Sequence, residues 1–230
     1  MTIRLLHKIQ RKYSAFRQYG PLPTLVNASL IAVALTFASA LSAGQSRTVL
    51  MIGDSLTAGL GLSRSQSIPV RLESALKKDG IDAKIINAGV SGDTTAGGRS
   101  RLAWALSEKP DAVIIELGAN DGLRGLDPQA TYENLDAIIA QTKQAGTRVL
   151  LTGMVAPPNL GSEYGEEFNA IYPALAEKHN VAFFPFFLEG VAAIAELNQD
   201  DAIHPNEKGV DTIVRNLLPY VKRLLRGGAE

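Results

Sequence analysis

The run Thr48-Val49-Leu50-Met51-Ile52-Gly53 is apolar from its second residue, ends in a glycine and is followed by the polar pair Asp54-Ser55. An uninterrupted apolar run of this kind is typical of a parallel strand that is covered on both faces. Similar runs occupy 84–88, 112–117, 148–152 and 181–184, and stretches with helical spacing separate them. This alternation predicts βαβ units with right-handed crossovers. We therefore predict one α/β domain, a three-layer α/β/α sandwich around a five-stranded, mainly parallel sheet.

The composition limits the kind of protein. The chain has 230 residues, 46% of them hydrophobic and 20% charged, which is ordinary for a globular domain and excludes wholesale disorder. Because it contains no cysteine, disulfides, a zinc finger and a cysteine nucleophile are excluded. The Lys+Arg and Asp+Glu counts are both 23, but residues 1–40 hold five of the basic residues and no acid. The rest is mildly acidic, which argues against nucleic-acid binding, since that binding neutralises phosphates.

The N-terminal segment has the three parts of a secretory signal. Residues 1–22 carry basic residues, 30–38 form a short apolar stretch, and Ala38-Ser39-Ala40 is an A-x-A cleavage pattern. The apolar stretch is shorter than the roughly 20 residues that a membrane-spanning helix needs. We predict that 1–43 is a signal peptide, that 44–230 is the folded domain with no membrane span once the leader is removed, and that the protein is periplasmic or secreted in a bacterium. An uncleaved N-terminal anchor is the alternative.

Polar clusters follow several predicted strands, and one more precedes the last predicted helix. They are Gly53-Asp54-Ser55-Leu56, Asn87-Ala88-Gly89-Val90-Ser91-Gly92-Asp93, Gly118-Ala119-Asn120-Asp121 and Asp201-Ala202-Ile203-His204-Pro205-Asn206. Each alone has an ordinary explanation, such as a helix cap or a tight turn. In open parallel sheets, however, ligand sites lie beyond the carboxyl ends of the strands. Their joint occurrence therefore favours a catalytic or binding site at that edge.

Histidine usage points to a single general base. Of the three histidines, His7 lies in the leader and His179 closes a predicted helix, where a cation suits the helix dipole. His204 is left, and Asp201 lies three residues before it, a spacing that puts both on one face of a turn. A carboxylate there can hold the imidazole Nδ1–H and leave Nε2 free towards a serine. Asp54 is expected to hold its own loop through hydrogen bonds of the Asx type.

Together the four clusters resemble the sequence blocks of the GDSL, or SGNH, hydrolase superfamily, in order and across the whole predicted domain. The resemblance implies a flavodoxin-like fold and a serine esterase that works through an acyl-serine intermediate without a cofactor. It implies that Ser55 is the nucleophile, that His204 is the general base and that Asp201 orients the imidazole. It also implies an oxyanion hole made by the N–H groups of Ser55 and Gly89 and the side-chain amide of Asn120. The likeness is greatest to bacterial multifunctional esterases with arylesterase, thioesterase and lysophospholipase activities.

The loop after the fourth predicted strand is the candidate acyl groove. Met154, Val155, Pro157 and Leu160 make it apolar, so it suits short-to-long acyl chains, although packing on the core is an equal alternative. We expect a small-molecule ester or thioester as the partner, and a monomer. A carbohydrate acetylesterase would need a polar, open groove here and is the alternative function; a silent binding domain is another. No metal or dinucleotide is expected, because the predicted domain has no His pair at ligand spacing and no G-x-G-x-x-G motif after its first strand.

Overall fold

The fold is seen in a computed structural model that describes residues 46–227, so the predicted leader, 1–43, lies outside the described residues. Its centre is a five-stranded sheet with strand order β2-β1-β3-β4-β5, and all of the pairings are parallel. The prediction of a five-stranded α/β sheet is confirmed. The strands are β1 (Arg47–Gly53), β2 (Ala83–Gly89), β3 (Ala112–Glu116), β4 (Arg148–Thr152) and β5 (Ala182–Phe184).

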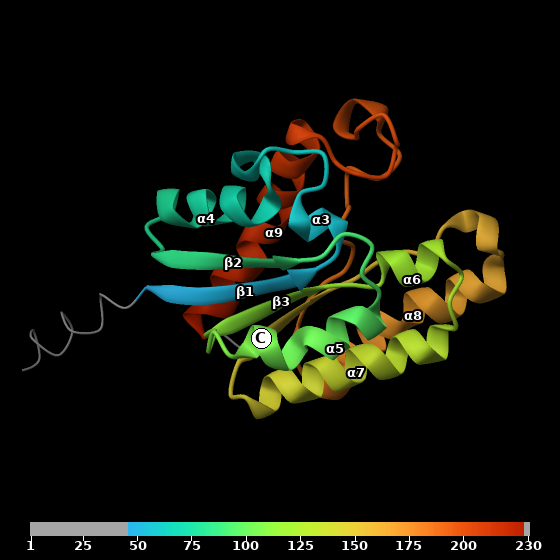
Figure 1. The fold of residues 1–230 in the computed structure, drawn as a ribbon, viewed down its shortest axis with the longest axis horizontal. Helices are drawn as coiled ribbons and strands as arrows, with labels where there is room; N and C mark the ends of the chain where they lie inside the picture. The colour runs from blue at the N-terminus through green and yellow to red at the C-terminus, as the bar shows by residue number, and fades with distance from the viewer. Residues whose placement is uncertain (1–45, 228–230) are drawn as a thin grey trace, which may run out of the picture. The chain divides into compact units, whose positions relative to one another are not determined.

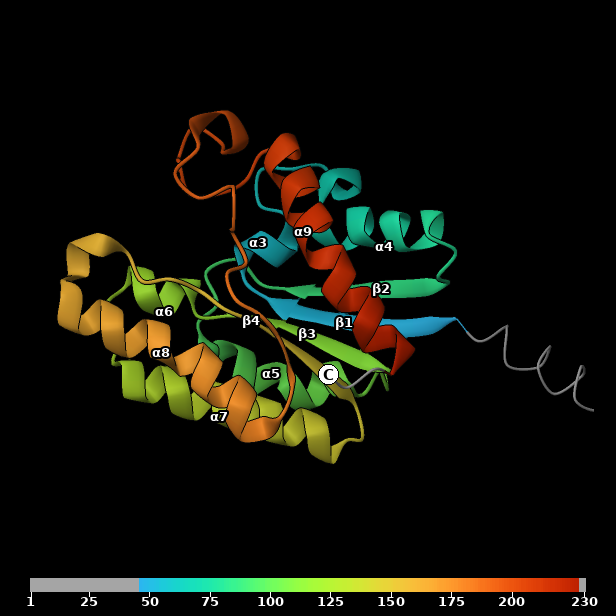
Figure 2. The same ribbon diagram turned by 180° about the vertical axis from the view of Figure 1, so that it is seen from behind.

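Helices cover both faces of the sheet and complete the predicted three layers (Figure 1). On one face lie α4 (Ile68–Lys78) and α9 (Glu207–Arg226), which contact each other. On the other lie α5 (Thr95–Leu106), α7 (Pro128–Gln144) and α8 (Ser162–His179), and the view from behind shows α7 and α8 side by side (Figure 2). Short helical turns connect these elements: α3 (Ser55–Ala58), η2 (Arg64–Gln66), α6 (Ala119–Leu123), η3 (Pro158–Leu160) and η4 (Ala195–Leu197).

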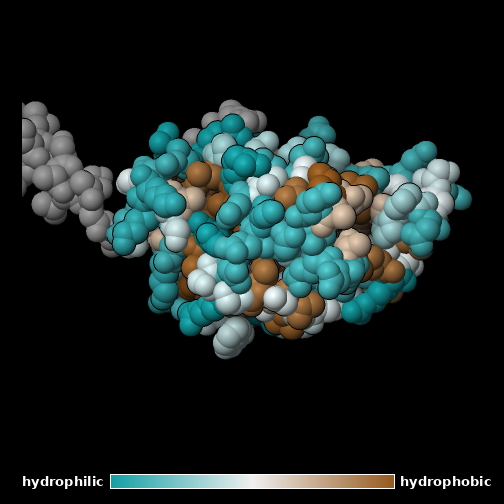
Figure 3. All heavy atoms as spheres, turned by 90° about the horizontal axis from the view of Figure 1, so that it is seen from above, coloured by the Kyte–Doolittle hydropathy of each residue, from teal (hydrophilic) through white to brown (hydrophobic). Residues whose placement is uncertain are grey.

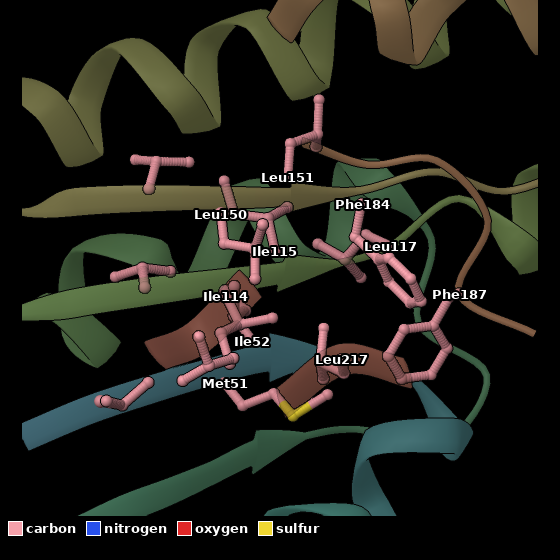
Figure 4. Close-up of a cluster of buried hydrophobic side chains, with 14 of the residues drawn as sticks. Met51, Ile52, Ile114, Ile115, Leu117, Leu150, Leu151, Phe184, Phe187 and Leu217 are labelled. Carbon is pink, nitrogen blue, oxygen red and sulfur yellow. The ribbon is translucent and has the colours of Figure 1, made fainter. Parts of the chain in front are cut away.

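The central strands form the core. All residues of β3 are buried, as are those of β1 from Val49 onward, because both faces of the sheet are covered by apolar helix faces. Side chains of β1, β3 and β4 pack in one continuous cluster with Phe184 of β5, with Phe187 after it and with Leu217 of α9 (Figure 4). Burial of this apolar surface is the main force that holds the strands in register. The uninterrupted apolar runs of the sequence are thus explained by sheet covering on both sides.

The strand order creates a crevice at the carboxyl edge of the sheet. After β1 the chain moves outward to β2, and after β2 it crosses to the other side of β1 to form β3. In doubly wound sheets of this order, the loops that follow β1 and β3 leave in opposite directions and a crevice opens between them. The Ser55 loop follows β1 and the Asn120 loop follows β3. The topology therefore brings together two of the polar clusters.

We expect substitution of the fully buried Ile114 by alanine to lower the free energy of unfolding by about 3 kcal/mol, because it leaves a cavity in a close-packed core. Urea denaturation followed by circular dichroism measures this. Trp104→Ala is the control, because Trp104 is 75% exposed on α5, and its effect should stay below about 0.5 kcal/mol. Equal effects of the two substitutions would contradict the assignment of the core.

Candidate active site

The loop after β1 holds Ser55 in one place. Asp54 is the N-cap of α3, and its Oδ1 accepts a hydrogen bond of 3.0 Å from the N–H of Leu56, as predicted for an Asx-type contact. Ser55 is the first residue of α3 and is only 8% exposed. Gly53 packs against β3 so tightly that a Cβ there would lie 2.4 Å from Glu116 Oε2. The serine hydroxyl is therefore fixed at the carboxyl end of a central, buried strand.

The loop before α9 brings an imidazole to this hydroxyl. Ser55 Oγ lies 2.8 Å from His204 Nε2, although 149 positions of sequence separate the two residues. On the other side of the ring, His204 Nδ1 lies 2.6 Å from Asp201 Oδ2. The second oxygen of Asp201 accepts the backbone N–H groups of Ile203 and His204, each at 2.9 Å. The structure thus brings together the three residues predicted from the sequence, in the order hydroxyl, imidazole, carboxylate.

The surroundings of Asp201 favour its ionised form. Its pKa is lowered to about 2, first because the backbone N–H of His204 stabilises the ionised carboxylate and then because the imidazole of His204 does. A carboxylate beside Nδ1 stabilises the tautomer with a proton on Nδ1, which leaves Nε2 to accept the Ser55 proton. Asp201 and His204 therefore have the geometry of a base and its orienting group within a single short turn.

Gln199 fastens this turn to the segment that follows α3. Its side-chain amide donates to the carbonyl of Leu60 at 2.8 Å and to that of Pro205 at 3.0 Å. Asn206 holds the next stretch by capping α9 with its side-chain oxygen and by donating to the carbonyls of Glu196 and Asn198. The long-range contact between Ser55 and His204 therefore rests on a network of hydrogen bonds around both loops.

The loop after β3 places Asn120 against the serine loop. Gly118 has a φ of 113°, and a Cβ on it would lie 2.0 Å from Tyr172 Oη, so only glycine fits this turn. Asn120 follows in α6, and its Nδ2 donates to Asp54 Oδ2 at 3.1 Å. An amide nitrogen carries two hydrogens, so one N–H of Asn120 stays available for another acceptor. The contact with Asp54 orients the amide beside Ser55.

The expectation for Gly89 is corrected by the structure. Its N–H donates to Asn87 Oδ1 at 2.9 Å, and the residue ends β2 outside the lining of the cavity that holds Ser55. Gly89 is needed for packing instead, because a Cβ there would lie 2.3 Å from the backbone nitrogen of Ala58. Its N–H is therefore not placed as an oxyanion donor.

Gly92 occupies the place in the wall of the cavity that was predicted for Gly89. It lines the cavity with Ser55 and Asn120, and within residues 46–227 no hydrogen bond uses its N–H. It occupies the third position of a turn closed by the Asp93 N–H and the Val90 carbonyl at 3.0 Å, with a φ of 83°. A glycine at that position is typical of a type II turn. The Val-Ser-Gly-Asp pattern was the signal in the sequence that distinguishes this glycine.

An apolar cavity of about 490 Å³ opens beside Ser55, His204 and Asn120. Of the predicted groove residues, Met154, Val155 and Pro157 line it and Leu160 does not. Figure 3 shows hydrophobic residues gathered right of centre, toward the end of the molecule at which the strands finish in Figure 1. The other apolar lining residues are Leu56, Leu60, Ala119, Leu123, Ala156, Pro158, Phe186, Leu188, Ala192, Ala193, Ala202 and Ile203.

A pair of buried carboxyl groups, Asp54 and Glu116, lies beneath the serine loop, and of the two only Asp54 was predicted to support this loop. Glu116, the last residue of β3, accepts hydrogen bonds at Oε2 from Thr57 Oγ1 at 2.6 Å and from the N–H of Asp54 at 3.3 Å. Burial raises the pKa of Glu116 well above its usual range and raises the pKa of Asp54 to about 6. The sequence signal that could have identified Glu116 is a charged residue inside the otherwise apolar run 112–117.

The fold and the site together define a hydrolase of the serine type. A hydroxyl hydrogen-bonded to an imidazole, which is in turn oriented by a carboxylate, recurs on unrelated folds as a means of acyl transfer. The model of the GDSL-like lipase/acylhydrolase family matches residues 51–211. The chain belongs to this family and is a hydrolase that acts on esters, as the sequence resemblance predicted.

Curated relatives and a solved structure agree with this assignment. The arylesterase of Vibrio mimicus is 42% identical over 177 residues, which are 76% of this chain and 88% of the relative. The thioesterase 1/protease 1/lysophospholipase L1 of Escherichia coli K12 is 39% identical over 197 residues, 84% of this chain and 91% of the relative. The crystal structure of TesA aligns with a TM-score of 0.74 and 42% identity over 77% of this chain and 99% of that one.

None of the helices between residues 46 and 227 is both long enough and apolar enough to cross a membrane. Over the same residues, His, Asp and Glu side chains do not gather in groups of three or more that could hold a metal ion.

The raised pKa of Asp54 predicts a pH dependence of stability. A carboxyl group whose pKa is higher in the folded state than in the unfolded state stabilises the fold at low pH, and this contribution is lost as the pH rises through the folded value of about 6. Between pH 4 and pH 7 the wild type should therefore lose on the order of 2–3 kcal/mol relative to Asp54→Asn, which cannot titrate. Urea denaturation of both proteins across this range measures the difference. Parallel pH profiles would contradict the buried, protonatable Asp54.

Proposed function

We propose that Ser55 attacks the carbonyl carbon of an acyl ester while His204 takes its proton. The observation that carries this is the 2.8 Å contact between Ser55 Oγ and His204 Nε2, with Asp201 Oδ2 2.6 Å behind the ring. Loss of the proton makes the hydroxyl a strong nucleophile, and the ionised Asp201 stabilises the imidazolium that forms. His204 then returns the proton to the leaving alcohol or thiol, which leaves an acyl-serine.

Three N–H donors stabilise the oxyanion of this reaction. They are the backbone N–H groups of Ser55 and Gly92 and the free N–H of the Asn120 side chain. The support for this set is that all three residues line one cavity and that Asp54 fixes the Asn120 amide. One such donor typically contributes a factor of about 10²–10³ to the rate. A neutral amide also suits the site because it does not hold the product carboxylate as a cation would.

Hydrolysis is completed by water. His204 removes a proton from a water molecule, the hydroxide attacks the acyl carbon, and Ser55 leaves with the proton that His204 then gives back. The overall mechanism has two steps and releases the alcohol or thiol before the acid. The three donors of the oxyanion hole serve both steps, because each forms a tetrahedral intermediate at the same carbon.

The substrate class follows from the cavity wall. Apolar residues from the loop after β4, including Met154, Val155 and Pro157, face the same cavity as Ser55. We propose that these residues bind the acyl chain of an ester or thioester, and that chains from short to long are accepted. The substrates would include aryl esters and lysophospholipids. The printed names of the relatives, arylesterase and thioesterase 1/protease 1/lysophospholipase L1, support this range. The alternative, a carbohydrate acetylesterase, is disfavoured because the wall is apolar.

The location and oligomeric state of the mature enzyme are part of the same proposal. The basic, apolar and small-residue parts of 1–43 support export to the periplasm or the medium after cleavage of a signal peptide. We propose a monomer that meets its ester substrate there. The substrates that we propose for that compartment are lysophospholipids and exogenous esters in preference to acyl-CoA.

Replacement of the nucleophile tests the mechanism. Ser55→Ala should lower kcat on p-nitrophenyl butyrate by at least about 10⁴-fold, because no acyl-enzyme can form. Ser63→Ala is the control, because Ser63 is an exposed serine at the N-cap of η2, and it should keep wild-type activity. Initial rates at saturating substrate measure the effect. Hydrolysis by Ser55→Ala at the wild-type rate would refute the proposal.

The acyl groove predicts a dependence on chain length. Val155→Asp should lower kcat/KM on p-nitrophenyl octanoate about tenfold and on the acetate less than twofold, because only the longer chain buries methylene groups against this wall. Leu126→Asp is the control, since Leu126 is 39% exposed and lies outside the lining. Equal losses on both esters would contradict the acyl groove and favour the carbohydrate alternative. The same alternative would be favoured if the wild type released acetate faster from acetylated xylan than from aryl esters.

A further inference from the structure

Arg124 makes a hydrogen bond that the proposed reaction does not use directly. It is the C-cap of α6, is exposed, and does not line the cavity beside Ser55. Its Nη2 donates to the carbonyl oxygen of Gly92 at 2.7 Å. A guanidinium donor makes the stronger, charge-assisted kind of hydrogen bond. Arg124 therefore contacts the turn that carries one proposed oxyanion donor without itself lining the cavity.

The same helix carries the second donor. Asn120 lies in α6, and the N–H of Arg124 bonds to the Asn120 carbonyl at 3.1 Å, so their relative positions are fixed by one helical turn. The helix itself is anchored through Asp121, whose buried carboxylate accepts from the N–H and the hydroxyl of Thr95. Arg124 thus extends from a rigid support to the Gly92 turn.

The Gly92 turn needs such support. Val90, Ser91 and Gly92 are all exposed, and an exposed turn with few packed neighbours moves more than a buried element. The guanidinium of Arg101 also supports this segment: it bonds to Asp93 Oδ2 at 2.6 Å and to the carbonyls of Gly53 and Ala88 at 2.9 and 2.7 Å. Arg101 ties the turn to the ends of β1 and β2.

We propose that Arg124 is a positioning residue, which holds the Gly92 turn at the correct distance from Asn120 and so preorganises the oxyanion hole. This inference rests on the proposed function, in which Gly92 and Asn120 are the donors. Donors stabilise a transition state only when they are already in place, so a misplaced N–H lowers the rate of the chemical step and leaves ground-state binding unchanged. The expected signature is a fall in kcat without a change in KM.

The test compares Arg124→Ala and Arg124→Lys with Arg99→Ala in the full-length protein. Arg99 is the matched control, because it is also an exposed arginine with one side-chain hydrogen bond, to Asn134, and lies outside the cavity lining. On p-nitrophenyl butyrate, kcat of Arg124→Ala should fall about tenfold at constant KM. The kcat of Arg124→Lys should lie between that of Arg124→Ala and that of the wild type. The thermal midpoints of all variants should match. Millimolar guanidinium chloride, well below denaturing concentration, should restore part of the activity of Arg124→Ala only.

Arg124→Ala with kcat within twofold of Arg99→Ala would overturn the inference. So would a loss of activity that guanidinium does not restore, because that loss would follow from folding or general charge. Failure of the proposed function gives a different result, since Ser55→Ala would then retain activity whatever the Arg124 variants do. The two ideas are therefore separable in one set of assays.

Discussion

Parallel pairing of β1 between β2 and β3 is the constraint on which the rest of the molecule depends. It places the ends of three buried strands side by side and separates the loops that leave them. The Ser55 and Asn120 loops then meet across that gap through Asp54, while Glu116 at the end of β3 accepts from the Asp54 backbone. The apolar sequence of the strands, required for burial, thereby determines where the polar groups of the site can gather.

The surroundings shift the pKa values of the carboxyl groups around the site in opposite directions. Asp201 is 45% exposed at its side chain and has a pKa lowered to about 2 by N–H donors. Asp54 and Glu116 are buried, and the loss of solvation raises the pKa of each. Different environments for like groups are a common means of dividing roles in an active site. Here the exposed carboxylate supplies charge to the imidazole, whereas the buried pair supports the serine loop and Asn120.

The sequence was sufficient for the architecture and for the local part of the site. Apolar runs and helical spacing predicted the five strands and three layers, because burial on two faces leaves a clear pattern. The pairing of Asp201 with His204 was predictable for a similar reason, since residues three apart in a turn are neighbours. Which glycine of the loop after β2 lines the cavity was not predictable, because the direction of a backbone N–H depends on a turn conformation that packing selects. The Asp54–Glu116 contact likewise depends on two strands meeting. Leu160 lies outside the cavity lining although Met154 to Pro158 of the same loop line it.

The compact turn that holds both Asp201 and His204 has a consequence for how the protein reaches its native state. A site assembled from three distant segments requires several long loops to close, and each closure costs chain entropy before any contact rewards it. Here the base and its orienting carboxylate can adopt their mutual geometry within four consecutive residues, before the domain has collapsed. The encounter between Ser55 and His204, across 149 positions, waits for the sheet to form, as does the arrival of Asn120 at Asp54. Catalytic competence should therefore arise late and cooperatively, as a direct report of completed folding.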